Sequence, residues 1–301
     1  MSTKSRPTLQ RMLDEPVSYL LWPRAALMQL AHPAIAPTEV ESGAYGNRGA
    51  HRWRATIEYL RLVASDDDES VRLLIREVNR IHASVRQPVD HDVDRPRRPA
   101  FDSANQGWVA ATWLHSLIDA YRLMISDIDD DVLDQLVVDF ERVGGLLQMT
   151  VDEWPQDYAA FLRYIEAGER TFPARLPRSD SRDAPERLLP GDVAAQVFST
   201  YSLPFRYVRM APTVRLLTWG AAGPQVREVY GVEWSQEHQQ LFDKRVRRWR
   251  RRMAWWPGVW RRRNGRKQRR RSAERLREHQ TLAYTEVKAI ERRRSRTKED
   301  A

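Results

Sequence analysis

Hydrophobic residues recur at intervals of three and four along most of this chain of 301 residues, and the alternation of a β-strand is rare. Helices with one apolar face are expected over residues 51–64, 69–85, 105–124 and 127–147, and a further helix begins within residues 150–169. Shorter helices are expected at residues 193–201 and 208–219, and another follows Ser235. The pattern therefore predicts an all-α fold.

The segment over residues 16–36 is apolar enough to be a buried helix. We expect it to break at Pro23 and to end near His32 and Pro33, because proline disrupts helical hydrogen bonding. The least charged part, residues 25–38, is shorter than the roughly 20 residues that cross a bilayer. The first residues contain no apolar core followed by a small-residue cleavage site, so a cytoplasmic protein is expected.

The remaining organisation follows from turn-forming and charged residues. Residues 87–104 contain three prolines and predict a surface loop, and residues 171–190 are rich in Pro, Asp, Ser and Arg and predict a linker. We expect one main helical domain over residues 18–262. An N-terminal segment, residues 1–17, precedes it, and a basic tail, residues 263–301, follows it.

Composition narrows the chemistry. The chain has no cysteine, which excludes disulfides, thiolate catalysis and thiolate-bound metals.

The net charge of +9 is unevenly distributed along the chain. Residues 244–301 contain 23 basic and 6 acidic residues, a net of +17, and the rest contains 27 basic and 35 acidic residues, a net of −8. An acidic body therefore carries a strongly basic C-terminal region.

A histidine, His82, stands among the aliphatic residues of the helix predicted over residues 69–85. Its spacing from Ile75 and Asn79 places the imidazole on the buried stripe, where both ring nitrogens need partners. The pattern by itself favours a hydrogen-bonded core histidine over a ligand-binding one.

Arg52 and Thr56 share one face of the preceding helix. An inward guanidinium requires an anion or several acceptors, although an exposed arginine beside a core threonine is the simpler interpretation.

Four segments in order resemble the catalytic domain of the oxygenases typified by latex-clearing protein (rubber oxygenase) and the MpaB oxygenase. Family members share segments of the forms Q-x-A-H-P, R-x-x-x-T, H-x-x-V and W-V-x-A-T. The matching residues here are Gln29, Ala31, His32 and Pro33; Arg52 and Thr56; His82 and Val85; and Trp108, Val109, Ala111 and Thr112. Weaker similarity extends over residues 18–260.

The resemblance implies a globin-like helical core with additional helices, holding a b-type haem. By position, His82 would be the proximal iron ligand, and Arg52 and Thr56 would lie close to the haem as binding and catalytic residues. An imidazole is the usual iron ligand where no thiolate exists, and propionates would supply the anionic partner of Arg52. The implied activity is haem-dependent oxygenation of a hydrophobic small molecule, such as an isoprenoid, lipid or secondary metabolite, with dioxygen or a peroxide.

The chain departs from the family at two positions. Many members have a histidine in the W-V-x-A-T segment where this chain has Ala110, and rubber-cleaving members can have a lysine where it has Ala55. Polyisoprene cleavage is therefore not expected. We expect His115 to be structural and His32 to position a turn. The remaining carboxylates considered, Asp119 and Asp152, are expected to be solvated.

The basic region contains an apolar stripe with a spacing of three and four, made of Val246, Trp249, Met253, Trp256 and Trp260. Pro257 is expected to bend or interrupt it. Such a segment suits the surface of an anionic membrane, a packed final helix followed by a solvated tail, or nucleic acid, the least favoured of the three. The alternative to the oxygenase is thus a haem-free helical protein that binds a membrane surface or partner through this Arg/Trp-rich region.

Overall fold

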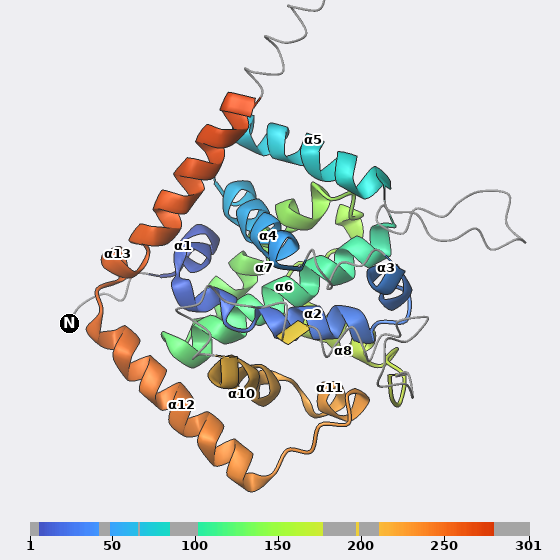
Figure 1. Ribbon diagram of the computed structural model, residues 1–301, viewed down its shortest axis with the longest axis vertical. Coiled ribbons are helices and arrows are strands. Elements are labelled where there is room, and N and C mark those ends of the chain that lie inside the picture. Colours follow the sequence, from blue (N-terminus) through green and yellow to red (C-terminus); the bar gives the residue numbers. More distant parts are fainter. Residues whose placement is uncertain are drawn as a thin grey trace, which may run out of the picture.

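A computed structural model describes residues 6–41, 49–65, 67–84, 102–176, 197–198 and 211–279. These residues form α-helices, short 3-10 helices and connecting turns, with no strand among them, so the all-α prediction is confirmed (Figure 1). None of the described helices is long and apolar enough to cross a membrane. Most of the predicted loop and linker lies outside the described residues.

Two helices, α2 (Trp22–Ala31) and α6 (Ser103–Met124), pack side by side at the centre of the molecule (Figure 1). All ten residues of α2 are buried. The predicted break at Pro23 is confirmed to within two residues, because a new helix, α2, begins there and this proline lies in its first turn, where its missing amide proton costs no helical hydrogen bond. A separate 3-10 helix, η1 (Pro16–Tyr19), precedes α2. As expected, α2 ends at His32.

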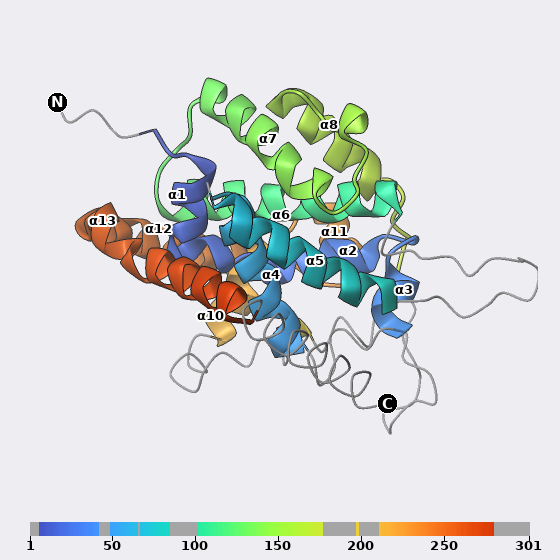
Figure 2. The ribbon, with the colours of Figure 1, turned by 90° about the horizontal axis from the view of Figure 1, so that it is seen from above.

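A layer of two helices, α7 (Asp130–Gly145) and α8 (Tyr158–Glu169), covers one side of α6 (Figure 2). The apolar face of α7 places Val137 and Phe140 in the core. Trp154 follows the 3-10 helix η3 (Val151–Glu153) and donates its indole N–H to the carbonyl of Val137 at 2.8 Å. The chain between the two helices is thereby tied to the core.

Three further helices pack along the other side of the central pair: α10 (Ala211–Ala221), α11 (Pro224–Val229) and α12 (Gln236–Trp255). The predicted helix after Ser235 is confirmed, and this serine caps α12 through the amide of His238. Leu176, in the predicted linker, is buried and donates its N–H to the carbonyl of Val229 at 3.1 Å. The described start of that segment therefore packs against α11.

The predicted helices that carry Thr56 and His82 are present as α4 (Gly49–Val63) and α5 (Asp68–Ser84). Asp67 caps α5 by accepting hydrogen bonds from the amide and the hydroxyl of Ser70, at 3.1 and 2.8 Å. Asp67 is therefore the residue that caps the start of α5. A short helix, α3 (Ala36–Glu41), follows α2 and lies near the far end of α5 in both ribbon views (Figures 1 and 2).

The two ends of the described chain are held together by ion pairs. Glu15, directly after α1 (Leu9–Asp14), accepts hydrogen bonds from Arg261 at 2.9 Å and Arg262 at 3.0 Å, in and beside α13 (Gly258–Arg261). The helix over residues 263–279 continues this contact, because Arg269 pairs with Asp14 at 2.6 Å.

Further along the same helix, Arg275 pairs with Glu58 of α4 at 2.8 Å and Arg277 with Asp67 at 2.5 Å. A glycine is needed at position 265, because a Cβ there would stand 2.4 Å from the carbonyl oxygen of Asp14. Residues 263–279 therefore pack along the acidic side of α1, α4 and the start of α5.

Removing the carboxylate of Glu15 should destabilise the protein far more than removing an exposed one. Glu15 is 0% exposed and faces two guanidinium groups, which Glu15→Ala would leave buried without their anion. We expect a loss of about 3 kcal/mol in the free energy of unfolding, measured by urea denaturation followed by circular dichroism.

Asp127→Ala is the matched control, because Asp127 also pairs with an arginine, Arg250, but is 85% exposed. The control should cost less than about 1 kcal/mol. Equal losses for the two variants would contradict the role assigned to Glu15.

Candidate functional site

The residues singled out by their spacing, Arg52, Thr56 and His82, lie on the neighbouring helices α4 and α5 (Figures 1 and 2). Burial decreases along both helices away from the turn that joins them. Leu60 of α4 is buried and Thr56 is half-buried, and Val71 of α5 is buried whereas Val78 is half-buried. The pair is therefore anchored in the core at one end and partly open at the other.

His82 lies in the last turn of α5, at this open end. At a rise of 1.5 Å per residue it stands about 21 Å along the helix from Asp68. It is half-buried and shares one face with Ile75 and Val78, two half-buried residues that pack against the core. The imidazole thus has apolar neighbours on its own helix and is partly exposed, with its Nδ1 atom buried.

Thr56 is half-buried on α4, one helical turn before Leu60. Arg52 is helical and lies one turn further out on the same face, and its side chain is outside the described part of the structure. The structure thus places Thr56 and His82 on contacting helices and fixes the backbone position of Arg52. No contact between these side chains is described.

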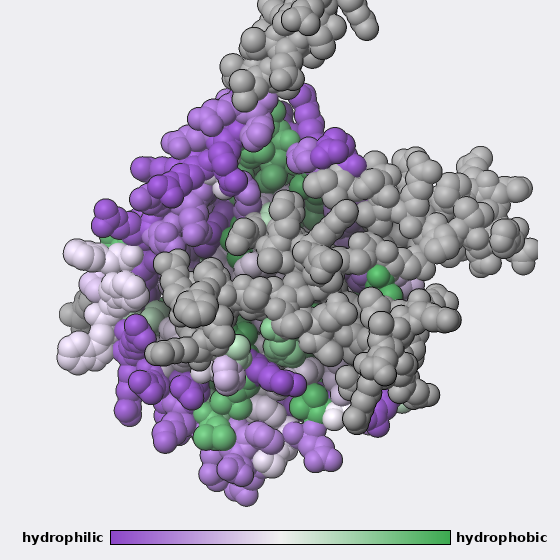
Figure 3. Space-filling view, viewed as in Figure 1, coloured by the Kyte–Doolittle hydropathy of each residue, from purple (hydrophilic) through white to green (hydrophobic). Residues whose placement is uncertain are grey.

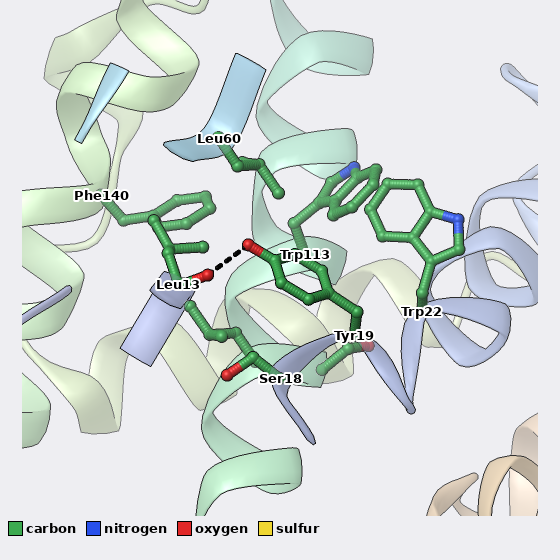
Figure 4. Close-up of a pocket in the computed structure, with 9 residues that line it drawn as sticks. Leu13, Ser18, Tyr19, Trp22, Leu60, Trp113 and Phe140 are labelled. Atoms are coloured by element: carbon green, nitrogen blue, oxygen red, sulfur yellow. Dashed lines mark hydrogen bonds between the residues drawn. The ribbon is translucent and has the colours of Figure 1, made fainter. Parts of the chain in front are cut away.

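An internal cavity lies at the inner end of the α4 face that carries Thr56 (Figure 4). Its volume is about 10 Å³, which is space for about one water molecule. Tyr19 donates its hydroxyl to the carbonyl of Leu13 at 2.5 Å, and Ser18 donates to that of Met12, so both hydroxyls are satisfied. The residues that line the cavity are Leu13, Ser18, Tyr19, Trp22, Leu60, Trp113, Ser116, Leu117 and Phe140.

Aromatic side chains surround this cavity. Trp53 of α4 packs with its ring centroid 4.7 Å from that of Trp22 and 6.0 Å from that of Tyr19. Trp113 of α6 also contacts Trp22. The residue that follows Arg52 therefore joins α4 to α2 and α6 through an aromatic cluster, which the sequence analysis did not identify.

The Q-x-A-H-P and W-V-x-A-T segments contact each other across the α2–α6 interface. Gln29 donates its side-chain amide to the hydroxyl of Thr112 at 2.8 Å, and that hydroxyl donates to a carbonyl in its own helix at 2.9 Å. The ring of His32 lies 5.3 Å from that of Trp108, whose indole N–H points to the carbonyl of Met28 at 3.4 Å. In this chain the two segments hold the central helices together.

Ala110 is buried at the contact between α6 and α7. A Cβ added at Gly144 would meet the Cβ of Ala110 at 3.3 Å and the sulfur of Met149 at 2.6 Å, so little room remains beside Ala110. The neighbouring Gln148 donates to Asn79 of α5 at 3.0 Å. The position at which many family members have a histidine is therefore filled in this chain by packing between α6 and α7.

A buried polar cluster joins α2 to α6 on the side of α8. The guanidinium of Arg24, 4% exposed, donates to the carboxylate of Asp119 at 2.7 Å and lies 3.1 Å from Nδ1 of His115. Asp119 is therefore ion-paired and not simply solvated, whereas Asp152 is exposed on η3. Arg24 was not among the residues predicted from the sequence to be functional or structural. The sequence feature that could have identified it is a single arginine within an apolar helix, because a buried charge needs a partner inside the protein.

Burial, aided by the positive charge of Arg24, lowers the pKa of His115 from 6.5 to about 3. Between these values the unfolded chain binds a proton that the folded chain does not, so stability is lost as the pH falls below about 6.5. His115→Gln removes the titrating group. We expect the unfolding free energy of this variant to fall less than that of the unsubstituted protein between pH 6.5 and about pH 5, by on the order of 2 kcal/mol.

Urea denaturation at the two pH values measures this difference. His279→Gln, a substitution of an exposed histidine, is the control and should keep the unsubstituted pH dependence. An unchanged pH dependence in His115→Gln would show that His115 is not held neutral by its surroundings.

Comparisons with known proteins agree with the four ordered segments. A family model described as "ER-bound oxygenase mpaB/B'/Rubber oxygenase, catalytic domain" matches residues 9–255. The uncharacterized proteins Rv2237 of Mycobacterium tuberculosis and Mb2261 of Mycobacterium bovis are each 32% identical over 230 residues, which cover 74% of this chain and 84% of each relative. No solved structure matches the chain. The chain belongs to the mpaB/rubber oxygenase catalytic-domain family and, as a member of it, is an oxidoreductase.

Proposed function

We propose that this protein is a haem-dependent oxygenase that oxidises a hydrophobic small molecule, and that His82 would bind the iron of a b-type haem. The observation that carries the proposal is the position of His82, a half-buried histidine on the apolar face of α5 beside the Thr56 face of α4. The chain has no cysteine, so an imidazole is the expected iron ligand in an apolar surrounding.

The described residues fit this group at the open end of the α4–α5 pair and not in the cavity. A cavity of about 10 Å³ cannot hold a porphyrin. By contrast, Trp53, Thr56 and Ile57 of α4 are half-buried, as are Ile75 and Val78 of α5, so both helices present incompletely covered apolar surface. When bound, a haem supplies iron at which dioxygen or a peroxide is activated.

The roles of the chain's own residues follow from their positions. His82 would bind through one ring nitrogen and so fix the cofactor to α5. Arg52 would offer its guanidinium to a propionate, a strong charge-assisted pair, and the hydroxyl of Thr56 would donate or accept a hydrogen bond at the same face of α4.

The proposed substrate class is a hydrophobic small molecule, an isoprenoid, lipid or secondary metabolite. Trp53, the half-buried member of the aromatic cluster, provides apolar surface beside the Thr56 face. Ala55, where rubber-cleaving relatives can have a lysine, is exposed and has no charge to offer. Cleavage of polyisoprene is therefore not part of the proposal.

The experiment compares His82→Ala with His279→Ala after expression with added haem precursor. We expect the first variant to lose the Soret band and at least about tenfold in haem affinity, because a ligating group is removed. The second, which truncates an exposed histidine, should keep both. Circular dichroism shows whether both variants are folded.

Added imidazole provides a test that a merely structural histidine would fail. It should restore the absorption spectrum of His82→Gly by occupying the vacated ligand position. Full retention of the Soret band in His82→Ala, or no effect of imidazole on His82→Gly, would contradict the assignment of His82.

A haem-free protein that acts through its C-terminal region remains the second candidate, because that region exposes tryptophan and arginine side chains. Colour separates the two candidates. A preparation that stays colourless after haem-supplemented expression supports the second candidate.

A further inference from the structure

Four large apolar side chains project from the bend between α12 and the helix over residues 263–279. Trp255 is 90% exposed, Trp256 44%, Val259 60% and Trp260 68%. We call these four residues the tryptophan elbow. The bend lies at the edge of the molecule beside the label of α13 in Figures 1 and 2. At this edge Figure 3 shows a pale projection between two strongly hydrophilic stretches.

The elbow does not continue the apolar stripe that the sequence predicts on one helix. Val246 and Trp249 of α12 are half-buried and Met253 is buried, and all three pack in a core cluster with residues of α6 and α10. Helix α12 then ends at Trp255, and Pro257 turns the chain. The predicted interruption at Pro257 is confirmed. The first three members of the stripe face the core, and its last two face solvent.

The backbone of the elbow is held from inside. Arg261 donates to the carbonyl oxygens of Met253 at 2.6 Å and Trp256 at 2.7 Å, and its remaining nitrogens bind the buried carboxylate of Glu15. These bonds satisfy carbonyl groups at the end of α12. The backbone that carries the exposed indoles is therefore held in place by these hydrogen bonds.

The surface around the elbow is strongly cationic. Residues 244–273 contain fifteen basic residues and no acidic one. Arg250, Arg261, Arg262 and Arg269 pair with carboxylates of the body. The other eleven form no ion pair with any residue in the described ranges, and all but Arg266 are exposed.

We propose that the tryptophan elbow is a docking surface for an anionic lipid bilayer. Indole rings favour the headgroup region of a membrane, where the ring is shielded and its N–H stays hydrated, and arginines beside them attract anionic lipids. A second copy of this chain does not fit, because two such cationic surfaces repel each other. Nucleic acid fits less well, because single strands bind along grooves and this apolar surface projects outward.

The proposal does not depend on haem, because membrane binding is measured without turnover. The full-length protein is sedimented with vesicles of phosphatidylcholine mixed with phosphatidylserine and, separately, with vesicles of phosphatidylcholine alone. We expect binding to the anionic vesicles and at least about tenfold weaker binding to the neutral ones.

Trp255→Ser/Trp260→Ser should weaken binding to the anionic vesicles about tenfold or more, because two indoles no longer enter the interface. Leu241→Ser is the matched control, since Leu241 is a 46% exposed apolar residue of the same helix α12 outside the elbow. It should bind as the unsubstituted protein does. Both changes are at exposed positions, and thermal denaturation shows whether the fold is kept.

Three results would overturn the proposal. The first is no sedimentation with anionic vesicles. The second is sedimentation that the double tryptophan variant leaves unchanged, which would indicate adsorption through arginines alone. The third is a preference for single-stranded DNA over anionic vesicles at equal salt, lost in the same variant, which would assign the elbow to nucleic acid.

Discussion

The complete burial of α2 is the constraint on which the arrangement of this protein depends. A helix with no exposed residue can carry polar side chains only if its neighbours satisfy them. Helix α6 does so at two levels, with Thr112 for Gln29 and with Asp119 and His115 for Arg24. These contacts fix the register of the central pair, against which α7, α8, α10 and α12 pack. The family segments on α2 and α6 thus stabilise the packing of these two helices, in addition to identifying the family.

A second constraint is the difference in net charge between the acidic body and the basic C-terminal region. In the folded protein, ion pairs join these two parts. Buried carboxylates at the end of α1 accept arginines from more than 240 residues later in the chain. The net charges of these parts were read from the sequence. They could not identify the partners, because choosing Glu15 and Arg261 requires knowing how the whole chain folds. The arginines that do not pair with the body surround the tryptophan elbow. The excess of arginine in this region therefore supplies both the ion pairs that join the chain ends and the positive charge of the surface.

Local patterns predicted the helices well, because capping and apolar spacing act within one or two turns, as at Asp67 and Ser235. The same reasoning placed Thr56 and His82 on consecutive helices. It missed what depends on contacts distant in sequence: Arg24 with Asp119, and the aromatic cluster around Trp53. It left open how the last helix packs, since only tertiary packing decides that Met253 is buried while Trp255 is exposed.

The central claim is that the α4–α5 pair of this oxidoreductase holds a haem. A pyridine haemochrome assay on the purified full-length protein, expressed with haem supply, tests it directly because the assay identifies the type of haem and its amount per chain. The account predicts the spectrum of haem b at about one haem per chain, as expected if His82 would hold one haem iron. A protein that is folded by circular dichroism and contains no haem under these conditions would contradict the account.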